Sequence, residues 1–481
     1  MSYSQSKESL RQFFDRLAPQ RDRWIAKNTY YYTELQRLHR WLIERKAEVL
    51  DIGCGTGDLL AAVAPRTGVG IDFSHEMVKN AASKYPQFTF RTEDAENLTT
   101  KQTFDYIILS NLVGYADDVW QVFRSVRRAC DVRTRIVITN YNYWWQPLFS
   151  LAEKLGWKMP DRIQNWLPQE FIVHFLYLNG FEVVKKGKYL HIPISIPIIS
   201  QIMNRVLPHL PLFRELALIE YIVARPLFPN ELSPRDVSVS IIIPTHEEAG
   251  NIEAVIERMP KIGKSTELVF VDLPGDDGTG RKINSEIRQY RGALTFKHST
   301  QAKKTGKMGA LRLGVQIASG EIILIYDADL TVPPEDLEKF YLALIENRGE
   351  LINGTRLVYP TEKGALRFIN HIGNATFATL FSWAFGQHFT DTLCGTKGFW
   401  KKDFYAFERT KLDITDLDHY GDFFLLLGAY RQNLKIAEVP VRYKIRSYGD
   451  TKLNRFRNGW QFLKLYVLFF WYYTVLKKGF T

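Results

Sequence analysis

The sequence predicts an α/β protein with two domains joined by a proline-bearing linker. Strand, turn and helix patterns begin near Ala47 and again near Val237, and in both halves further buried strands end in polar residues. Between them, the stretch 224–236 carries prolines at 226, 229 and 234, which is typical of a linker. We therefore expect one domain at 1–229, a second at 230–460 and a C-terminal segment at 461–481.

Composition and charge limit the classes of protein to which the chain can belong. Its 481 residues, 46% of them hydrophobic, fit two to four globular domains and exclude wholesale disorder and coiled coil. The three cysteines are widely spaced, which argues against a disulfide framework and favours a reducing cytosol. A net charge of +11 suits nucleic acid, an anionic membrane surface or phosphorylated substrates. No nucleic-acid-binding motif is visible, so we expect no nucleic-acid partner.

The two ends of the chain differ in their relation to membranes. The first 24 residues carry charges throughout and lack the apolar core of a secretory signal peptide. The stretch 465–476 is apolar except for Thr474, but a helix of this length would span about 18 Å of a hydrocarbon core ~30 Å thick. Lys464 and Lys477 flank it, and three aromatic residues at 471–473 suit the headgroup level. We expect an interfacial amphipathic helix; a terminal helix packed on its own domain is the alternative.

The first half carries a glycine turn and several polar strand ends. A buried strand at 48–52 runs into GCGTGD at 53–58, where glycines let a ligand approach the backbone near a helix N-terminus. A second strand ends at Asp72, a position suited to hydrogen bonds with ribose hydroxyls. Two further strands lead to EDAE at 93–96 and to SNL at 110–112.

This series resembles the class I S-adenosylmethionine-dependent methyltransferases, on VLDIGCGTGD, GIDFS at 70–74, EDAENL at 93–98 and FDYIILSN at 104–111. The resemblance covers about residues 1–225 and implies a Rossmann-like fold with S-adenosylmethionine as cofactor. It places Asp51, Gly53, Gly55 and Gly57 at the methionine part, Asp72 at the ribose, and Asp94 with Ala95 at the adenine. A binding module without methyl transfer, which recruits or regulates the other domain, is the alternative.

The methyl acceptor is harder to predict. Acceptors in this fold lie beyond the carboxyl ends of the strands. The residues expected there are Asn111, Tyr115, Asn140, Tyr141, Asn142, Tyr143 and Trp144, and none is an evident general base. An apolar, proline-bearing segment at 190–213 separates two late strands. It suits an acceptor lid, a lipid contact or a packed cover.

The second half carries three strands with polar ends. The first runs into Pro244 and Thr245, the second ends at Asp272, and the third ends in Asp327-Ala328-Asp329. Two carboxylates at positions i and i+2 after one strand can both bind a single hard divalent cation. Such a cation can bridge the phosphates of a nucleotide diphosphate.

These strands resemble glycosyltransferase family 2, with its parallel-sheet GT-A nucleotide-sugar fold. Further stretches resemble polyprenyl-phosphate sugar synthases of the dolichol-phosphate mannose type, over about residues 237–460. They are IIIPTHEE at 241–248, DGTG at 277–280, GKMGALRLG at 306–314, DADLTVPPEDL at 327–337, NGTR at 353–356, DTLCGTKGF at 391–399 and YGDTKL at 448–453. The resemblance implies inverting, metal-dependent transfer from a nucleotide diphosphate sugar to a polyprenyl phosphate or a related lipid-linked acceptor.

The resemblance also implies roles for individual residues. The residues implied at the base and ribose are Pro244, Thr245, Glu247 and Asp272. Those implied at Mg²⁺ or Mn²⁺ are Asp327 and Asp329, with Thr331 as a third contact. Lys307, Arg446 and Lys452 are implied at the donor diphosphate or acceptor phosphate, and Arg356 and Arg367 at the acceptor phosphate. Many members carry a second acidic residue after Asp272, where this chain has Leu273. The donor nucleotide therefore stays open.

The acceptor decides whether a general base is needed. A phosphomonoester is already anionic near pH 7 and needs none, whereas a sugar hydroxyl requires a carboxylate. Asp422 is the first candidate for that base and Asp391 the second. We expect a bifunctional enzyme, peripheral on the cytoplasmic face of a membrane, whose halves act in one glycan or glycolipid pathway. Transfer to a sugar hydroxyl in polysaccharide synthesis is the alternative.

Overall fold

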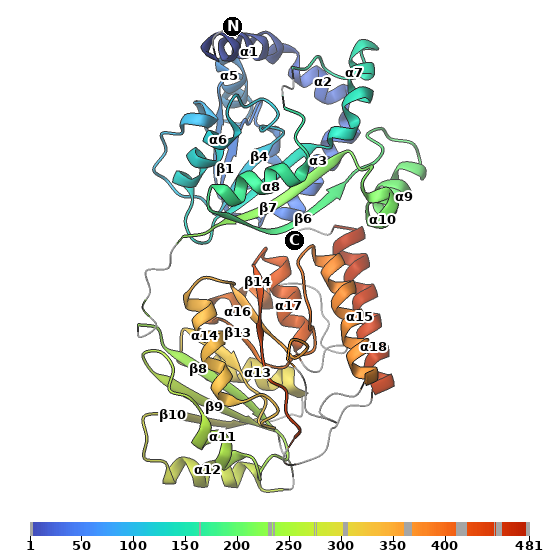
Figure 1. Cartoon of the computed structure of the whole chain (residues 1–481). Helices are drawn as coiled ribbons and strands as arrows, with labels where there is room; N and C mark the ends of the chain where they lie inside the picture. Colours follow the sequence, from blue (N-terminus) through green and yellow to red (C-terminus); the bar gives the residue numbers. More distant parts are fainter. Residues whose placement is uncertain are drawn as a thin grey trace. The chain divides into compact units, whose positions relative to one another are not determined.

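The chain divides into two compact units. Unit 1 comprises Met1–Phe228 with Trp471–Thr481, and unit 2 comprises Pro229–Phe470 (Figure 1). The computed structural model describes residues 3–162, 165–228, 233, 236–273, 275, 277–301, 306–359, 368–409, 421–446, 448 and 455–477. The change of unit after Phe228 lies beside the boundary expected at 229, and residues 471 onward return to unit 1.

Strands and helices alternate through unit 1. Its strands are β1 (Glu48–Ile52), β2 (Thr67–Asp72), β3 (Thr89–Thr92), β4 (Tyr106–Ser110), β5 (Arg135–Tyr141), β6 (Phe181–Tyr189) and β7 (Ile219–Pro226). Its helices are α1 (Tyr3–Leu17), α2 (Arg21–Lys27), α3 (Thr29–Leu42), α4 (Asp58–Ala62), α5 (His75–Lys84), α6 (Val119–Val126), α7 (Gln146–Lys154), α8 (Gln169–Leu178), α9 (Ile199–Val206) and α10 (Pro211–Arg214). Short 3₁₀ turns are η1 (Ala18–Gln20), η2 (Ala95–Asn97), η3 (Arg127–Ala129), η4 (Tyr143–Trp145) and η5 (Leu207–His209).

The sheet of unit 1 has the order β3-β2-β1-β4-β5-β7-β6. The strands from β3 to β5 are parallel, and β7 runs antiparallel to both β5 and β6. Buried side chains such as Leu50, Ile107 and Ile136 form the core beneath the sheet. Because the parallel strands end at one edge, Asp51, Asp72 and Ser110 come to the same side of the sheet.

Unit 2 repeats the alternation. Its strands are β8 (Val239–Thr245), β9 (Thr266–Asp272), β10 (Thr295–Thr300), β11 (Ile322–Ile325), β12 (Leu351–Thr355), β13 (Lys397–Trp400) and β14 (Ile436–Pro440). Its helices are α11 (Ile252–Arg258), α12 (Thr279–Gln289), α13 (Gly306–Ile317), η6 (Pro334–Asp336), α14 (Leu337–Ile345), α15 (Phe368–Phe385), α16 (Lys401–Glu408), α17 (Asp422–Arg431) and α18 (Arg455–Phe469).

The sheet of unit 2 has the order β10-β9-β8-β11-β13-β12-β14 and is mixed, not parallel throughout. The odd strand is β13, which runs antiparallel to β11, with Ile325 opposite Lys397. An antiparallel neighbour begins where β11 ends, so the residues just before β13 lie beside the carboxyl end of β11. A Cβ atom on Gly395 would stand 2.1 Å from Asp327 Oδ2, so a larger residue there would displace the Asp327 carboxylate.

The last helix differs from the one expected at 465–476. In the structure, α18 ends at Phe469 and continues as a π-helical turn, η7 (Phe470–Val475). Phe381 of α15 contacts the rings of Tyr466 and Phe469, so one face of α18 packs within unit 2. Lys477, which we expected as a flanking lysine at the membrane interface, is buried in unit 1 with its Nζ 4.3 Å from the Trp41 ring centroid. No helix in the described part of the chain is both long and apolar enough to cross a bilayer.

Candidate active sites

Unit 1 contains a cavity of about 350 Å³ at the carboxyl edge of β1, β2 and β4. Of the residues expected at a cofactor, Asp51, Gly53, Gly55, Asp72, Asp94 and Ala95 line it. Gly57 is not among the lining residues; it precedes α4 with a φ of 79°, and a Cβ atom there would stand 2.9 Å from the Phe90 ring. The glycine turn therefore shapes the cavity partly through its backbone path.

Two aspartates at the floor of this cavity have different partners. Asp72 accepts hydrogen bonds from the backbone N–H groups of Gly55 and Ser74, both at 2.9 Å. Asp51 is 1% exposed, and its Oδ2 has no hydrogen-bond partner in the structure. Burial and the neighbouring charge of Asp72 raise the pKa of Asp51 to about 7.

The unpaired oxygen of Asp51 is a test of whether the cavity fits a cofactor. A buried carboxylate without a donor is costly, and a ligand bearing an ammonium group would supply that donor. The methionine part of S-adenosylmethionine carries one, and Asp72 stands at the end of the next strand, where ribose hydroxyls bind in this fold. The residues present therefore fit S-adenosylmethionine.

No sequence pattern marked Lys7 as a residue of the cavity wall. Lys7 of α1 reaches across to Asp94 Oδ2 at 2.5 Å and to Glu96 Oε2 at 2.9 Å. Burial acts to lower the pKa of Lys7, but its hydrogen bonds to Asp94 and Glu96 outweigh burial and raise it. Lys7 thus stays charged and fixes the side chain of Asp94 at the cavity wall.

The expected acceptor residues separate into two groups. Asn111, Tyr115 and Tyr141 line the cavity, whereas Asn140, Asn142, Tyr143 and Trp144 do not appear among its lining residues. Tyr115 donates to Asp161 Oδ1 at 2.6 Å, and Tyr31, which sequence patterns missed, donates to Tyr141 at 3.0 Å. Burial raises the pKa of both Tyr115 and Tyr141 well above the ordinary value, so neither phenol serves as a base.

Unit 2 brings its two strand-end aspartates into contact with cations from distant elements. Lys307 Nζ of α13 lies 2.5 Å from Asp327 Oδ1, and Arg446 Nη2 lies 2.7 Å from Asp329 Oδ2. Burial acts to lower the pKa of Lys307, but the charges of Asp327 and Asp422 outweigh burial and raise it. Both cations are thus held at the carboxyl end of β11.

Thr331 positions Asp329. Its Oγ1 and its backbone N–H both donate to Asp329 Oδ1, at 2.7 and 3.1 Å. Arg446 also reaches Glu248 Oε1 at 3.4 Å, which connects this end of β11 to the turn after β8. Asp329 is therefore held by three hydrogen bonds from two residues.

The residues expected at the nucleotide lie along β8 and β9. Thr245, the residue after the half-buried Pro244, donates through its Oγ1 to Asp272 Oδ1 at 3.1 Å, in register across the two strands. Burial raises the pKa of Asp272 above its ordinary value. Glu247 is exposed in the turn after β8, with a φ of 58°. The side chains of Asp272 and Glu247 thus lie in different environments.

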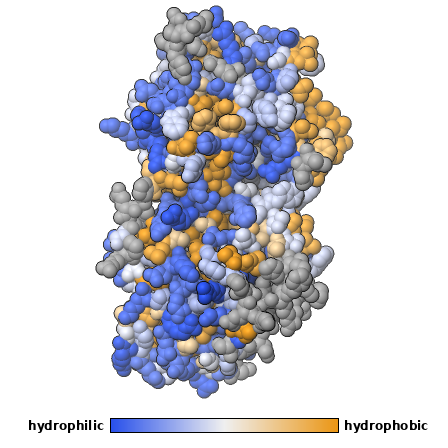
Figure 2. All heavy atoms as spheres, in the orientation of Figure 1, coloured by the Kyte–Doolittle hydropathy of each residue, from blue (hydrophilic) through white to orange (hydrophobic). Residues whose placement is uncertain are grey.

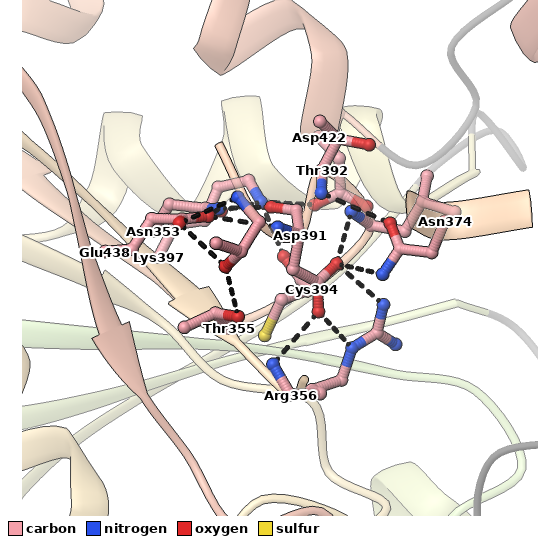
Figure 3. Close-up of polar contacts among 12 residues, drawn as sticks. Asn353, Thr355, Arg356, Asn374, Asp391, Thr392, Cys394, Lys397, Asp422 and Glu438 are labelled. Atoms are coloured by element: carbon pink, nitrogen blue, oxygen red, sulfur yellow. Dashed lines mark hydrogen bonds and ion pairs between the residues drawn. The ribbon is translucent and has the colours of Figure 1, made fainter. Parts of the chain in front are cut away.

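Asp391, one of the candidate bases, is completely engaged in hydrogen bonds. It is fully buried and pairs with Arg356 through two bonds of 2.7 and 2.9 Å, and Asn374 donates to its Oδ1 at 2.7 Å (Figure 3). The backbone N–H groups of Arg356 and Leu393 also donate to it. The Arg356 guanidinium holds its pKa low against the effect of burial, which acts to raise it. Asp391 therefore acts as a positioning anchor for Arg356.

Asp422, the other candidate base, begins α17 and lies 3.3 Å from Lys397 Nζ. Lys397 is itself fully buried and donates to Asn353 Oδ1 and to the carbonyl of Cys394 (Figure 3). The charge of Asp422 also raises the pKa of Lys307. This carboxylate therefore stands close to the cations at the end of β11.

Comparisons with known proteins agree with this division of the chain. Residues 240–426 match the family model for glycosyl transferase family 2, and residues 49–132 match a methyltransferase domain model. Over 238 residues the chain is 30% identical to glycosyltransferase AglJ of Haloferax volcanii. This match covers 48% of the chain and 72% of AglJ. The chain belongs to glycosyltransferase family 2.

This family 2 glycosyltransferase is also 28% identical over 236 residues to dolichol-phosphate mannosyltransferase of Pyrococcus furiosus, which covers 45% of this chain. The match spans only 59% of the length of the Pyrococcus protein. A solved structure from Thermotoga maritima, described as an S-adenosylmethionine-dependent methyltransferase, is 14% identical. It covers 45% of this chain and 98% of its own, with a TM-score of 0.35. On its two family-model matches, the chain is an enzyme with a glycosyltransferase domain and a methyltransferase domain, and the latter has a Rossmann-like sheet.

Three points about the family 2 site follow from its residues. Lys452 and Arg367 lie outside the described residues. The described residues contain no group of three His, Cys, Asp or Glu side chains that could hold a metal ion alone. Asp327 and Asp329 nevertheless fit the way Mg²⁺ is often bound, by one or two carboxylates together with substrate phosphates.

Proposed function

We propose that unit 2 transfers a sugar, with inversion, from a nucleotide diphosphate sugar to a polyprenyl phosphate or a related lipid-linked acceptor. We propose further that unit 1 transfers a methyl group from S-adenosylmethionine in the same glycan or glycolipid pathway. The resemblance to dolichol-phosphate mannosyltransferase supports the lipid-phosphate acceptor. The shared chain is the reason for assigning both steps to one pathway.

One observation carries the sugar-transfer proposal: each strand-end aspartate is paired with a cation from elsewhere in unit 2. Lys307 and Arg446 pair with Asp327 and Asp329 and neutralise their charges. Both cations can shift to phosphate oxygens when a nucleotide diphosphate arrives. They would then stabilise the charge that develops on the leaving diphosphate.

The proposed metal is Mg²⁺ or Mn²⁺, held by Asp327 and Asp329. When bound, it would supply a positive charge to the leaving diphosphate. Thr331 supports this role indirectly, because its two hydrogen bonds orient Asp329. Thr245, Glu247 and Asp272 remain the proposed contacts of the base and ribose, with Pro244 beside them.

The hydrogen-bonding of the acidic residues favours a phosphate acceptor. Asp391 has both oxygens committed to Arg356, Asn374 and backbone donors, so it cannot accept a proton from a substrate hydroxyl without breaking those bonds. A phosphate acceptor needs no base, and Arg356 is a cation suited to it. A hydroxyl acceptor is the second candidate, because Asp422, the proposed base for it, lies near Lys307 at the same site.

For unit 1, the unpaired Asp51 oxygen supports S-adenosylmethionine as the bound molecule. In the proposal Asp51 holds its methionine part, Asp72 its ribose, and Asp94 with Ala95 its adenine. Asn111, Tyr115 and Tyr141 would orient the acceptor. A module that binds the cofactor without transferring methyl is the alternative.

Peripheral attachment to the cytoplasmic face of a membrane is part of the proposal. Trp460, Leu463 and Val467 of α18 lie at helical spacing and are all exposed, and Lys464 lies beside Trp460. Exposed apolar and aromatic residues next to lysine suit a helix in the bilayer interface. Such a helix would keep the active site near a lipid acceptor.

The test is mass spectrometry of extracted lipids after incubation with undecaprenyl phosphate, S-adenosylmethionine, a divalent metal and a panel of nucleotide sugars. We expect a lipid that gains one sugar in the native chain and in Glu335→Gln, whose carboxylate pairs with Arg258 outside the site. The product should be absent with Asp329→Asn. A further methyl-sized increment would place both domains on one product. If nucleotide sugars bind and no lipid gains mass, the lipid-phosphate acceptor is wrong.

A further inference from the structure

Helix α9 of unit 1 buries its polar face and exposes its apolar face, which is the reverse of an ordinary surface helix. Its buried residues are the polar Ser200 and Asn204. Asn204 accepts hydrogen bonds from the backbone N–H groups of His191 and Ile192 and donates to Tyr30, and Ser200 donates to the carbonyl of Ile194. A surface helix normally turns its apolar stripe toward the core. Here hydrogen bonds hold the polar face inward, and the apolar face is presented outward.

The outward face is continuous along the helix. Ile199, Ile202 and Val206 of α9 recur at intervals of three and four residues and are 52%, 56% and 40% exposed. Side chains at this spacing share one side of a helix. Figure 2 shows hydrophobic side chains gathered at the edge of unit 1 that carries α9 and α10.

Helix α7 presents a second stripe of the same kind. It has no buried residue, and Leu148, Leu151 and Leu155 are each more than half exposed along one face. Phe149 and Ala152, on another face of α7, line the cavity of unit 1. Trp145 Nε1, at the start of α7, donates to the carbonyl of Leu216 just after α10, so the two segments adjoin.

These stripes flank the cavity. Pro193 and Ile194, which precede α9, line the same cavity as Phe149, Ala152 and Trp157 from α7 and the residues after it. An apolar surface therefore continues from the exposed helix faces to the cavity wall. We call the faces formed by 148–157 and 194–206 the apolar rim.

The charges around the apolar rim favour a lipid surface over a protein partner. Residues 190–214 include Arg205 and Arg214 and no carboxylate. The stretch 144–158 adds Lys154 beside Glu153, and Lys158, whose charge is paired with Asp161. Basic residues beside exposed Leu, Ile and Trp are the pattern of surfaces that bind anionic headgroups and insert apolar side chains.

We infer that the apolar rim docks unit 1 on a bilayer containing anionic lipid, so that the methyl acceptor enters the cavity from the membrane. This inference concerns the methyltransferase domain and goes beyond the proposed sugar transfer of unit 2. It assigns the methyl acceptor to the class of lipid-borne molecules. Each exposed aliphatic side chain of the rim would leave water on docking.

A reporter on the rim tests the docking in the full-length chain. The native cysteines are all buried, so Ile202→Cys can be labelled selectively with an environment-sensitive fluorophore. We expect its emission to move to shorter wavelength with vesicles of phosphatidylcholine and phosphatidylglycerol, and less with phosphatidylcholine alone. Phe171→Cys, an exposed apolar position on α8, is the matched control and should not respond.

Two results would overturn the docking. One is an unchanged Ile202→Cys signal while the chain sediments with vesicles, because α18 alone would then hold it. The other is a signal that changes with protein concentration in the absence of vesicles, which would make the rim a contact between two copies. The fluorophore reports unit 1 alone, so a failure of sugar transfer leaves this result readable.

The acceptor class is tested with methyl-labelled S-adenosylmethionine and vesicles made from total lipid of the expressing cells. We expect the label in the organic extract, and at least about a tenfold loss in the Leu151→Ser, Ile202→Ser double variant, because two side chains no longer insert. Cofactor binding, measured by calorimetry, should stay unchanged, and Phe171→Ser should keep native transfer. Label found only in water-soluble products would overturn the lipid-borne acceptor.

Discussion

Arg446 Nη2 lies 2.7 Å from Asp329 Oδ2, although 117 residues separate the two along the chain. The pair joins the segment after β14 to the carboxyl end of β11. This cation neutralises the charge of Asp329 at the carboxyl end of β11. The acidic pair therefore repels a diphosphate less than two uncompensated carboxylates would.

Replacing Arg446 with glutamine should lower the kcat of sugar transfer by about 10²–10³-fold, the usual effect of removing one donor to a developing charge. Arg442→Gln is the matched control, since Arg442 is exposed on the same segment and stacks over Tyr359. Steady-state kinetics with a lipid-phosphate acceptor measure the effect. Equal kcat in both variants would remove Arg446 from the site.

Asp422→Asn distinguishes the two acceptor classes. With a phosphate acceptor, turnover should stay within a few-fold of native, because no proton has to be taken up. With a hydroxyl acceptor, loss of the base should cost about 10²–10⁴-fold. Donor binding must be measured alongside, since Asp422 also faces Lys397. A large fall in turnover with intact donor binding would favour the hydroxyl acceptor.

Asp391→Asn should lower the free energy of unfolding of unit 2. It would leave the Arg356 guanidinium facing a neutral amide in a buried site, which typically costs about 3–5 kcal/mol. Glu346→Gln, which removes an ion pair with Arg348 that is exposed on both sides, should cost about 1 kcal/mol or less. Urea unfolding of unit 2 provides the comparison. Equal losses in the two variants would contradict the anchoring role.

The raised pKa of Asp51 predicts a pH dependence of the stability of unit 1. With a folded pKa of about 7, the folded chain keeps a proton that the unfolded chain loses near pH 4. Its contribution to stability therefore falls as the pH rises from about 4 to 7, by about 1.4 kcal/mol per pH unit. Asp51→Asn should remove this loss and be more stable than the native chain at pH 8.

The same substitution should weaken S-adenosylmethionine binding, because a neutral amide offers the ammonium group a hydrogen-bond acceptor without a negative charge. Urea unfolding at pH 5 and pH 8 and calorimetric titration measure the two effects. Glu76→Gln on α5 is the control for both. A variant that gained stability and kept full affinity would show that Asp51 does not hold the cofactor.

Chelation of divalent cations should abolish sugar transfer, and Mg²⁺ or Mn²⁺ should restore it. Asp327→Asn should raise the metal concentration needed for half-maximal activity, because one of two carboxylate ligands is lost. Glu335→Gln should leave that concentration unchanged. Full activity in the presence of a chelator would exclude the proposed cation.

The sequence patterns predicted much of the fold because the signals are local. The strand at 48–52 and the strands that end at Asp72 and Asp272 are short hydrophobic runs bounded by turn residues, and the structure has a strand at each. The mixed sheets were harder to anticipate. The antiparallel direction of β13 depends on how the chain returns from α15, and the residue types within β13 do not predict that direction.

The contacts of the sites depend on residues far apart in the sequence. Nothing in α1 marks Lys7 as the partner of Asp94, because a lysine on a polar helix face is usually solvated. The hydrogen-bond partners of Asp391 were equally hidden from the sequence. A carboxylate in a conspicuous motif suggested a base, whereas its saturation by Arg356 and Asn374 is visible only in three dimensions.

The return of the chain to unit 1 after Phe470 affects how the gene can be divided. Arg37 donates to the carbonyl of Leu476 at 2.6 Å, and burial, with the charge of Arg37, lowers the pKa of Lys477 to about 7. In terms of gene architecture, the glycosyltransferase coding region interrupts that of the methyltransferase. A fragment truncated after Phe228 would leave Trp41 without Lys477 over its ring. Expression of the methyltransferase alone therefore requires residues 471–477 to be joined back to it.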